Sequence, residues 1–257
     1  MYLDKIVEKH RAIAQQDTRS TKDLVARATN VEQPRRFIDR IRTDSVNELA
    51  LITEIKRRSP SLGALNQDLD PIQIAQQYEQ GGASCLSVLT DSEFFGGSTE
   101  DLQQARSNVG LPVLRKDFTV SLNDVCDARI MGADCVLLIV AALSVKELTE
   151  FKKLADELSL DTLVEVHDEP ELEIALNIGA SMIGVNQRDL KTFEVDHQRA
   201  VRMAAQMPTS VVRVAESGVR TRDDAQSLRD AGYHAILVGE SLVTSNNIAT
   251  SVRELRV

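Results

Sequence analysis

Several short apolar segments of this chain end in lysine or glutamate residues. The segment "VLRKDF" (113–118) shows the pattern, because Val113 and Leu114 suit a buried strand whereas Lys116 does not. The same change occurs in four other segments, at Glu54 and Lys56, at Glu165, at Asn186 and Arg188, and at Glu216 and Ser217. Lysines and carboxylates in one cavity suit general acid–base catalysis, and a lysine could also form a Schiff base. We therefore expect a catalytic site made of Lys and Glu.

A charge at the end of one strand can simply be solvated, so a single position would not indicate a site. Five segments with the same pattern and with mixed signs favour a shared cavity. Because successive strand residues alternate in direction, Asp117 is expected to point away from Lys116 and to brace backbone or a basic side chain outside the cavity. His167 borders a loop, and we interpret it as a hydrogen-bonded structural residue.

The composition argues against several other classes of function. The formal net charge of -9 disfavours non-specific nucleic-acid binding, because phosphates would be repelled. The 3 cysteines form no C-x-x-C pair, so we expect neither disulfides nor structural zinc, and reduced thiols favour a cytoplasmic protein. The 4 histidines lack the spacing of metal ligands, so no metal is expected. The longest apolar run, 135–143, is too short to span a membrane, and residues 1–16 do not resemble a signal peptide.

Short β-rich segments alternate with amphipathic stretches from residue 51 onward. We expect strands at 51–56, 85–90, 112–117, 135–141, 162–167, 182–188, 211–217 and 235–241, and helices at 144–160 and 168–179. A glycine suited to a left-handed helix cap precedes four of these strands, at Gly82, Gly132, Gly179 and Gly232. This order predicts a single-domain (β/α)₈ TIM barrel. A doubly wound open sheet is the alternative, but no G-x-G-x-x-G follows the first strand.

Residues 1–50 are expected to form an N-terminal helical extension of the barrel rather than a domain of their own, because they have too few apolar residues for a separate core. Two helical faces are indicated, the first by Ile6, Ile13 and Ala14 and the second by Phe37, Ile38, Ile41 and Val46. The polar stretch 19–36 between them predicts loops. Whether the extension covers the barrel mouth or its side is open.

The carboxyl ends of the strands of a parallel barrel meet at one mouth, where barrel enzymes hold their catalytic groups. Gly218 and Gly239 occur in the turns after the last two strands, where barrels commonly bind phosphate through backbone N–H groups. Ser59 and Ser61 in "RRSPS" (57–61) add hydroxyls beside positive charge. These features predict a small phosphorylated substrate.

Eight motifs, in order and at consistent spacing, resemble indole-3-glycerol phosphate synthase, a family of tryptophan biosynthesis. They are EIKRRSPS (54–61), FFGGS (94–98), PVLRKDF (112–118), LLIVAAL (137–143), LVEVHD (163–168), GVNQRDL (184–190), VAESGV (214–219) and LVGESL (237–242). The resemblance implies a (β/α)₈ barrel with an N-terminal helical segment. It also implies a carboxy-lyase that converts 1-(2-carboxyphenylamino)-1-deoxyribulose 5-phosphate to indole-3-glycerol phosphate by ring closure, decarboxylation and dehydration. No cofactor and no metal are implied.

The resemblance implies roles for the matching residues. Lys116 would protonate the ribulose carbonyl oxygen as the ring closes, and Glu165 would be the second catalytic carboxylate. Lys56 and Glu54 would transfer protons and hold anionic parts of the substrate; how the dehydration is divided between them and Glu165 is open. The residues that would hold substrate hydroxyls and order the catalytic groups are Asn186, Arg188, Glu216 and Ser217. Those that would contact phosphate are Ser59, Ser61, Gly218 and Gly239. Those that would pack against the anthranilate ring are Phe95, Phe118, Leu137 and Leu190.

The pKa of Lys116 is a further open question, because burial and Lys56 would lower it whereas Glu165 and Glu54 would raise it. Two positions depart from the family pattern. Leu62 follows S-P-S where a lysine or similar residue is usual, which could change how the first loop closes. Gln187 replaces the usual Asn or Ser, and alternation points it outward.

Two other functions are considered. Phosphoribosylanthranilate isomerase, or another phosphate-binding barrel, is the enzymatic alternative, and the isomerase would need a Cys/Asp pair at the mouth. A barrel that only binds a phosphorylated metabolite would not need a buried Lys/Glu set. We expect a monomer, because no extended apolar surface stripe is obvious.

Overall fold

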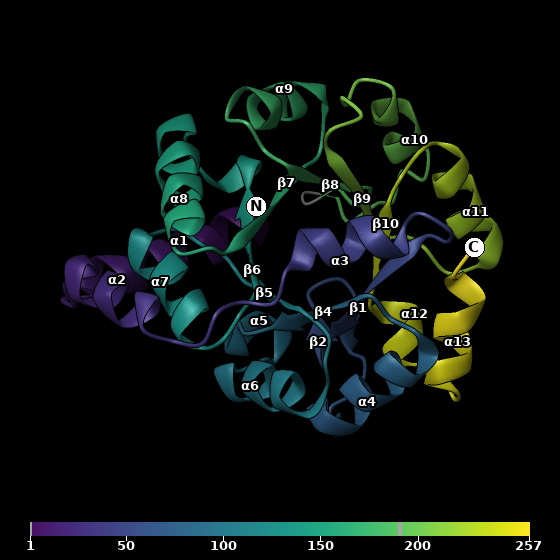
Figure 1. Ribbon diagram of the computed structural model, residues 1–257, viewed down its shortest axis with the longest axis horizontal. Helices are drawn as coiled ribbons and strands as arrows, with labels where there is room; N and C mark the ends of the chain where they lie inside the picture. Colours follow the sequence, from purple (N-terminus) through teal and green to yellow (C-terminus); the bar gives the residue numbers. More distant parts are fainter. Residues whose placement is uncertain (1, 190–191) are drawn as a thin grey trace.

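Eight parallel strands close into a barrel in the computed structural model of the chain, which describes residues 2–189 and 192–257 (Figure 1). The strands are β1 (Ala50–Ile55), β4 (Cys85–Leu89), β5 (Val113–Lys116), β6 (Cys135–Ile139), β7 (Asp161–Val166), β8 (Met182–Asn186), β9 (Val212–Glu216) and β10 (Ala235–Val238). Pairing of β1 with both β4 and β10 closes the ring. The predicted (β/α)₈ barrel is confirmed, and each strand ends slightly before its predicted limit, where the chain turns into a loop.

Helices surround the strands (Figure 1). The outer ring is α4 (Pro71–Gly81), α6 (Thr99–Asn108), α7 (Leu122–Ile130), α8 (Val145–Glu157), α9 (Glu169–Asn177), α10 (Arg199–Ala204), α11 (Arg222–Asp230) and α13 (Ile248–Leu255). Both predicted helices are present, and each starts at a cap, because Ser144 forms a capping box with Glu147 and Asp168 accepts from the backbone of α9. The predicted glycine caps are left-handed, with φ values of 89°, 98°, 72° and 90° at Gly82, Gly132, Gly179 and Gly232.

Several short elements lie in the loops that follow the strands. They are the antiparallel hairpin of β2 (Arg58–Ser59) and β3 (Gly63–Ala64), the helices α5 (Ser92–Phe95) and α12 (Glu240–Val243), and the 3₁₀ turn η1 (Val140–Ala142). The hairpin carries Ser59 and is absent from the sequence-based prediction. Leu62 is exposed between its strands.

Apolar side chains fill the structure on both sides of the barrel wall. Leu51 packs in the core between strands and helices, whereas its neighbour Ile52 packs inside the barrel, as the two-residue period of a strand requires. The barrel interior also contains Ala50, Cys85, Leu114, Cys135, Leu137, Ile139, Leu163, Met182, Val212, Val214, Ala235 and Leu237. No helix in the described ranges is both long and apolar enough to cross a membrane.

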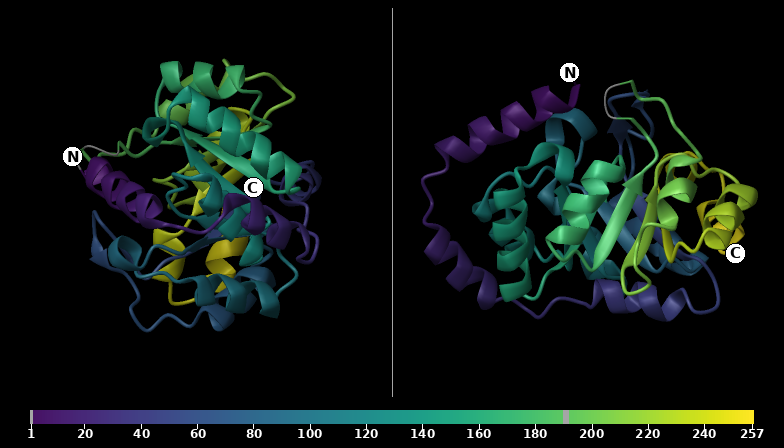
Figure 2. Two further views of the ribbon diagram at one scale, coloured as in Figure 1. Left: turned by 90° about the vertical axis from the view of Figure 1, so that its left-hand side faces the viewer. Right: turned by 90° about the horizontal axis from the view of Figure 1, so that it is seen from above.

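The N-terminal helices lie on three different sides of the barrel (Figure 2). α1 (Tyr2–Gln16) crosses the end where the strands finish, α2 (Thr21–Thr29) packs on α7, and α3 (Phe37–Asp44) lies across the opposite end. α3 closes that end, because Phe37, Ile38 and Ile41 join the core inside the barrel. The open question is thereby answered: α1 covers the mouth.

Two expectations for the extension are wrong. Part of the stretch predicted as loops is the helix α2. Only Leu24 and Ala28 of this helix are buried, so its apolar face is too narrow to give a recognisable helical period in the sequence. Ile13 and Val46 do not belong to buried faces, since they are 57% and 75% exposed. Val46 lies beyond the end of α3, where the helical period no longer applies.

Candidate active site

Four charged side chains come from alternate strands at the mouth. They are Glu54 on β1, Lys116 on β5, Glu165 on β7 and Glu216 on β9. The residues two positions earlier lie in the core inside the barrel: Ile52, Leu114, Leu163 and Val214. The charged residues therefore form the next inward-facing layer, in the place where a barrel normally stacks another set of branched apolar side chains. This is why apolar strands of this chain end in charges.

Lys116 is held between two carboxylates. Its Nζ lies 3.2 Å from Oε2 of Glu165 and 3.7 Å from Oε2 of Glu216. The lysine side chain is 17% exposed and each of those two glutamates only 2%. Burial lowers the pKa of Lys116, but the attraction of Glu165, Glu216 and Glu54 outweighs burial and raises that pKa above its usual value. The direction that the sequence left open is therefore upward, and Lys116 is an ammonium at neutral pH.

The pKa values of the two carboxylates beside Lys116 are shifted in opposite directions. Burial raises the pKa of Glu165, but Lys116 and His167 outweigh burial and hold that pKa well below its usual range. Burial and the charge of Glu165 raise the pKa of Glu216, and Lys116 offsets only part of this effect. The mouth thus holds one ionised and one readily protonated carboxyl group around a single ammonium.

Lys56 and Glu54 form a second pair on the first strand. Lys56 Nζ lies 2.6 Å from Glu54 Oε1, and the hydroxyl of Ser87 donates to Glu54 Oε2 at 3.4 Å. Gly239 allows this carboxylate to approach the last strand, because a Cβ at residue 239 would lie 2.7 Å from Glu54 Oε1. The pair is therefore fixed against the turn that the sequence assigns to phosphate.

Asn186 and Arg188 occupy the end of β8. Asn186 Nδ2 donates to Glu165 Oε1 at 3.1 Å, and Asn186 Oδ1 accepts the backbone N–H of Arg188 at 3.0 Å. The guanidinium of Arg188 donates to the Phe193 carbonyl at 3.2 Å and lies 3.4 Å from Glu240 Oε2. Asn186 thus orients the carboxylate of Glu165, whereas Arg188 reaches the helix α12 after the last strand.

The residues predicted to contact phosphate line the same cavity: Ser59, Ser61, Gly218 and Gly239, together with Ser217. The Oγ atoms of Ser59 and Ser61 are 3.4 Å apart. Ser217 and Gly218 both have left-handed backbone, with φ values of 68° and 80°. A non-glycine residue in that region costs free energy, and such residues cluster at functional sites. A side chain at 218 would also collide with Val195, whose Cγ1 lies 2.5 Å from the Cβ position.

An apolar wall borders part of the same cavity. The rings of Phe95 and Phe118 have centroids 6.4 Å apart, and Leu137 lies deeper in the barrel. Leu3 and Ile6 of α1 line the cavity as well, which the sequence did not predict. Leu190, which the sequence assigns to this wall, lies outside the described residues.

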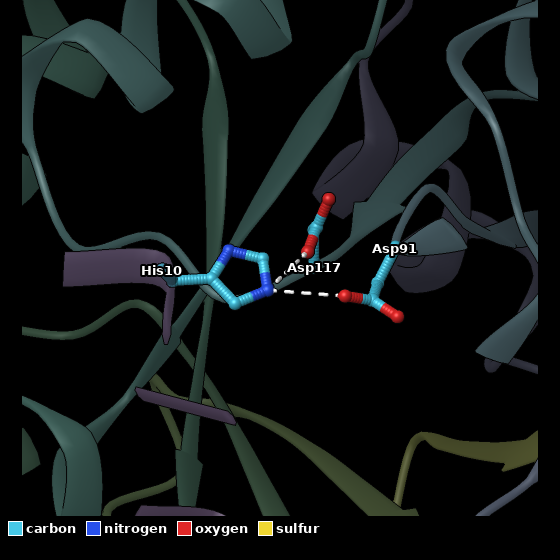
Figure 3. A group of neighbouring side chains, drawn as sticks. All are labelled: His10, Asp91 and Asp117. Atoms are coloured by element: carbon cyan, nitrogen blue, oxygen red, sulfur yellow. Dashed lines mark hydrogen bonds and ion pairs between the residues drawn. The ribbon is translucent and has the colours of Figure 1, made fainter. Parts of the chain in front are cut away.

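His10, Asp91 and Asp117 form a group whose potential ligand atoms lie within 4.8 Å of one another (Figure 3). Its carboxylates are already held by protein donors. Asp91 accepts two backbone N–H groups of α5, and Asp117 accepts from Thr90 and Arg115. His10 Nε2 lies 3.1 Å from Asp91. We interpret the group as the contact that fixes α1 over the mouth rather than as a metal site. Asp117 pairs with the basic side chain of Arg115 as predicted, but it lines the cavity instead of lying outside it.

Comparison with known proteins decides the family. A family model described as indole-3-glycerol phosphate synthase matches residues 3–255. The chain belongs to the indole-3-glycerol phosphate synthase family. Relatives of that name are 47% identical over 96% of both chains in Chloroherpeton thalassium and 44% identical over 98% of both in Rhodopirellula baltica. Members of this family are enzymes, decarboxylating lyases of tryptophan biosynthesis.

Solved structures with little sequence similarity share the fold of this synthase family member. Thiamine phosphate pyrophosphorylase from Pyrococcus furiosus has a TM-score of 0.61 at 17% identity, covering 80% of this chain and 93% of that one. N-acetylmannosamine-6-phosphate 2-epimerase from Clostridium perfringens has a TM-score of 0.60 at 12% identity, covering 77% and 90%. At such low identity these two likenesses support the barrel fold alone.

The structure brings the other predicted site residues of this family member together around one cavity, and it adds one contact to them. His167 was interpreted as a hydrogen-bonded structural residue; its Nδ1 is hydrogen-bonded to Glu171, and its Nε2 also lies 3.3 Å from Glu165 Oε1. The contact could have been found from the sequence, because His167 follows Glu165 by two residues and residues two apart in a strand point to the same side. Gln187 points away from the cavity as predicted, and its Nε2 donates to the Ser217 carbonyl at 2.8 Å.

Proposed function

We propose that the chain converts 1-(2-carboxyphenylamino)-1-deoxyribulose 5-phosphate to indole-3-glycerol phosphate, carbon dioxide and water, by acid–base catalysis with Lys and Glu side chains. The observation that carries the proposal is the ammonium of Lys116, held 3.2 Å from Glu165 and 3.7 Å from Glu216 inside the barrel mouth. The same cavity is lined by serines and glycines of the loops after β1, β9 and β10 and by aromatic side chains of the loops after β4 and β5. A substrate with a phosphate at one end and an aromatic ring at the other fits this division.

Ring closure needs a group that neutralises the ribulose carbonyl oxygen as the aromatic carbon attacks. Lys116 suits this step, because its raised pKa keeps the ammonium charged at neutral pH. As the new carbon–carbon bond forms, the proton passes from Nζ to the oxygen and leaves a hydroxyl. Loss of carbon dioxide then returns the electron pair of the broken bond to the ring.

Dehydration needs a protonated acid for the leaving hydroxyl and an ionised base for the proton lost from the ring system. Glu165 meets the second requirement, because Lys116 and His167 hold its pKa low. Lys56 is a second ammonium at the mouth and meets the first. We therefore assign the acid to Lys56 and the base to Glu165, with Glu54 and Asn186 keeping them in position through contacts of 2.6 Å and 3.1 Å.

Substrate binding is assigned to the rest of the cavity. Arg188 offers a planar cation for the substrate carboxylate or phosphate. The phosphate is assigned to the loops with Ser59, Ser61, Gly218 and Gly239. The anthranilate ring is assigned to Phe95, Phe118 and Leu137. No step of this scheme uses a metal or cofactor.

The isomerase alternative is less well supported. It would need a cysteine at the mouth, but Cys85, Cys126 and Cys135 are all buried and none lines the cavity. Burial also raises the pKa of Cys85 and of Cys135, which makes a thiolate unfavourable.

The experiment is a fluorescence assay with chelator-treated protein. Addition of the carboxyphenylamino-deoxyribulose phosphate should produce indole fluorescence and one equivalent of carbon dioxide. Phosphoribosylanthranilate should be left unchanged. Conversion of phosphoribosylanthranilate without indole formation would show that the isomerase is the correct assignment, and binding without turnover would favour a metabolite-binding barrel.

A further inference from the structure

His167 contacts Glu165 from behind the catalytic layer. Glu165 Oε2 faces Lys116 Nζ at 3.2 Å, whereas Glu165 Oε1 faces His167 Nε2 at 3.3 Å and accepts from Asn186 Nδ2 at 3.1 Å. Each oxygen of this carboxylate therefore has a cationic neighbour. His167 does not line the cavity itself, so any effect on the reaction must pass through Glu165.

The other nitrogen of His167 faces a second carboxylate. Nδ1 lies 3.0 Å from Oε2 of Glu171, and the same oxygen accepts the backbone N–H of His167 at 2.7 Å. Glu171 is in the first turn of α9, whose cap Asp168 fixes that turn. A neutral imidazole has a proton on only one nitrogen, whereas both nitrogens of this ring face a carboxylate, so the charged ring suits the site better. The contact of Nε2 with Glu165 is an ion pair at 3.3 Å rather than a well-directed hydrogen bond.

The charges around the ring support that state. Glu165 of β7 and Glu171 of α9 face the ring, and Lys116 of β5 lies beyond Glu165. Burial lowers the pKa of His167, but the two carboxylates outweigh burial and raise it to about 10. The ring therefore keeps its charge through the neutral range.

The state of Glu216 indicates how the charge of His167 affects the carboxylates at the mouth. Glu216 Oε1 is buried and has no hydrogen-bond partner among the described residues. A protonated Glu216 can donate to Glu165, whereas two ionised carboxylates beside one lysine would repel each other. Lys116 lies nearer to Glu165 than to Glu216 and already favours ionisation of Glu165, and a cation behind Glu165 adds to that preference.

We propose that His167 is a positioning residue: fixed by Glu171, its imidazolium orients Glu165 and keeps it ionised, so that the proton shared by the two carboxylates beside Lys116 stays on Glu216. The proposal rests on the proposed function, for which it explains how two similar glutamates acquire different roles. Glu171 becomes part of the same device, although it is on a helix outside the barrel.

The test uses His167→Gln, which removes the charge but keeps a polar side chain, and Glu171→Gln, which leaves the histidine in place. His234→Gln is the matched control, because His234 is a partly buried histidine at the opposite end of the strands, where its Nδ1 accepts the backbone N–H of Arg213. We measure kcat and KM from about pH 3 to about pH 10, because the low pKa of Glu165 places the acid limb below the usual carboxyl range, and we follow the Glu165 carboxyl and the His167 ring by NMR.

We expect His167→Gln to lower kcat by about tenfold, part of the contribution of one acid–base group, with KM within about twofold of wild type. The acid limb of the kcat profile should move upward by about one pH unit, because Glu165 loses a cation and becomes harder to ionise. Glu171→Gln should move the acid limb in the same direction by a smaller amount, and His234→Gln should leave the acid limb where it is in wild type. A lower kcat with an unmoved acid limb would overturn the proposal.

The NMR measurement separates this proposal from the proposed function, because it needs no turnover. The His167 ring should stay protonated at pH 8, and the carboxyl of Glu165 should titrate at higher pH in either variant than in wild type. A neutral His167 at pH 8, or an unchanged Glu165, would refute the proposal even if the enzyme makes indole. If His167→Gln does not fold, the titration of Glu165 in Glu171→Gln and the protonation of the His167 ring in the wild-type protein still test the proposal.

Discussion

Lys116 Nζ lies 3.2 Å from Glu165 Oε2 although β6 separates their strands in the barrel. The contact is possible because side chains from alternate strands form one layer inside a closed barrel. Two residues below, the same strands meet through Leu114 and Leu163 in an apolar layer. The ammonium of Lys116 and the carboxylate of Glu165 are therefore held on the rigid barrel wall rather than on loops.

Replacement of the central ammonium gives the first prediction. Lys116→Met should lower kcat by at least about a hundredfold, the usual contribution of a general acid, while KM changes little. The lost cation also makes Glu165 harder to ionise, so the remaining activity should have its acid limb at higher pH. Steady-state kinetics across pH measure both effects.

Lys152→Met is the control for that substitution. The Lys152 side chain is 16% exposed, close to the 17% of Lys116, and it lies 2.8 Å from Asp156 on the outer helix α8. It should leave kcat unchanged. Near-normal turnover of Lys116→Met would exclude Lys116 as the acid.

Much of this site follows from the sequence, because the period of two along a strand is local and closure of the barrel then brings the strand ends together. Lys116 and Glu165 could be placed in this way without any knowledge of distances. The direction in which the pKa of Lys116 shifts could not be predicted, because it depends on how closely three carboxylates approach one ammonium. The contacts of His167 could not be predicted for a similar reason: its second partner, Glu171, is on the following helix, and only the fold brings it 3.0 Å from the ring.

Gly184 gives the second prediction, because it provides the space for Glu216. A Cβ at residue 184 would lie 2.1 Å from Glu216 Oε1 and 3.1 Å from Leu163 Cδ1. Gly184→Ala should therefore displace the carboxyl group rather than the backbone. We expect kcat to fall by about tenfold or more, with a modest loss of stability, about 1–3 kcal/mol for an overpacked core.

Gly179→Ala separates crowding at the site from backbone effects. Gly179 has a φ of 72° and nothing within 4 Å of its Cβ position. Its substitution should cost about 1–2 kcal/mol of stability from the left-handed conformation and should leave kcat unchanged. If Gly184→Ala loses only stability and keeps its kcat, Glu216 does not need its present position.

The guanidinium of Arg188 gives the third prediction. Arg188→Ala should raise KM and lower kcat together, each by about tenfold or more, because a cation that positions the substrate acts before and during the reaction. Arg202→Ala is the control, since Arg202 pairs with Asp196 at 2.5 Å and is 55% exposed. Unchanged kcat and KM in Arg188→Ala would show that this side chain does not contact the substrate.

The cover of the mouth gives the fourth prediction. His10→Ala removes the 3.1 Å contact with Asp91 and the packing on Phe118, whose ring centroid lies 5.4 Å from that of His10. α1 should then be less firmly held, so its amides should exchange faster and KM should rise several-fold. Asp91→Asn should have a smaller effect, because asparagine still caps α5. Exchange that stays slow in His10→Ala would show that the other contacts of α1, among them Arg11 with Glu147 at 2.7 Å and Lys9 with Glu93, are enough to hold the helix.

The dependence of stability on pH gives the fifth prediction. The pKa of His167 is raised to about 10, so its contribution is fully present below the unfolded value of about 6.5 and is lost as pH rises through about 10. The stability deficit of His167→Gln, measured by urea unfolding, should therefore shrink between pH 7 and 10. His234 has a pKa lowered by burial, so its contribution is present above about 6.5 and lost as pH falls. The deficit of His234→Gln should accordingly shrink toward acid pH, and a common trend in the two variants would contradict the assigned charge states.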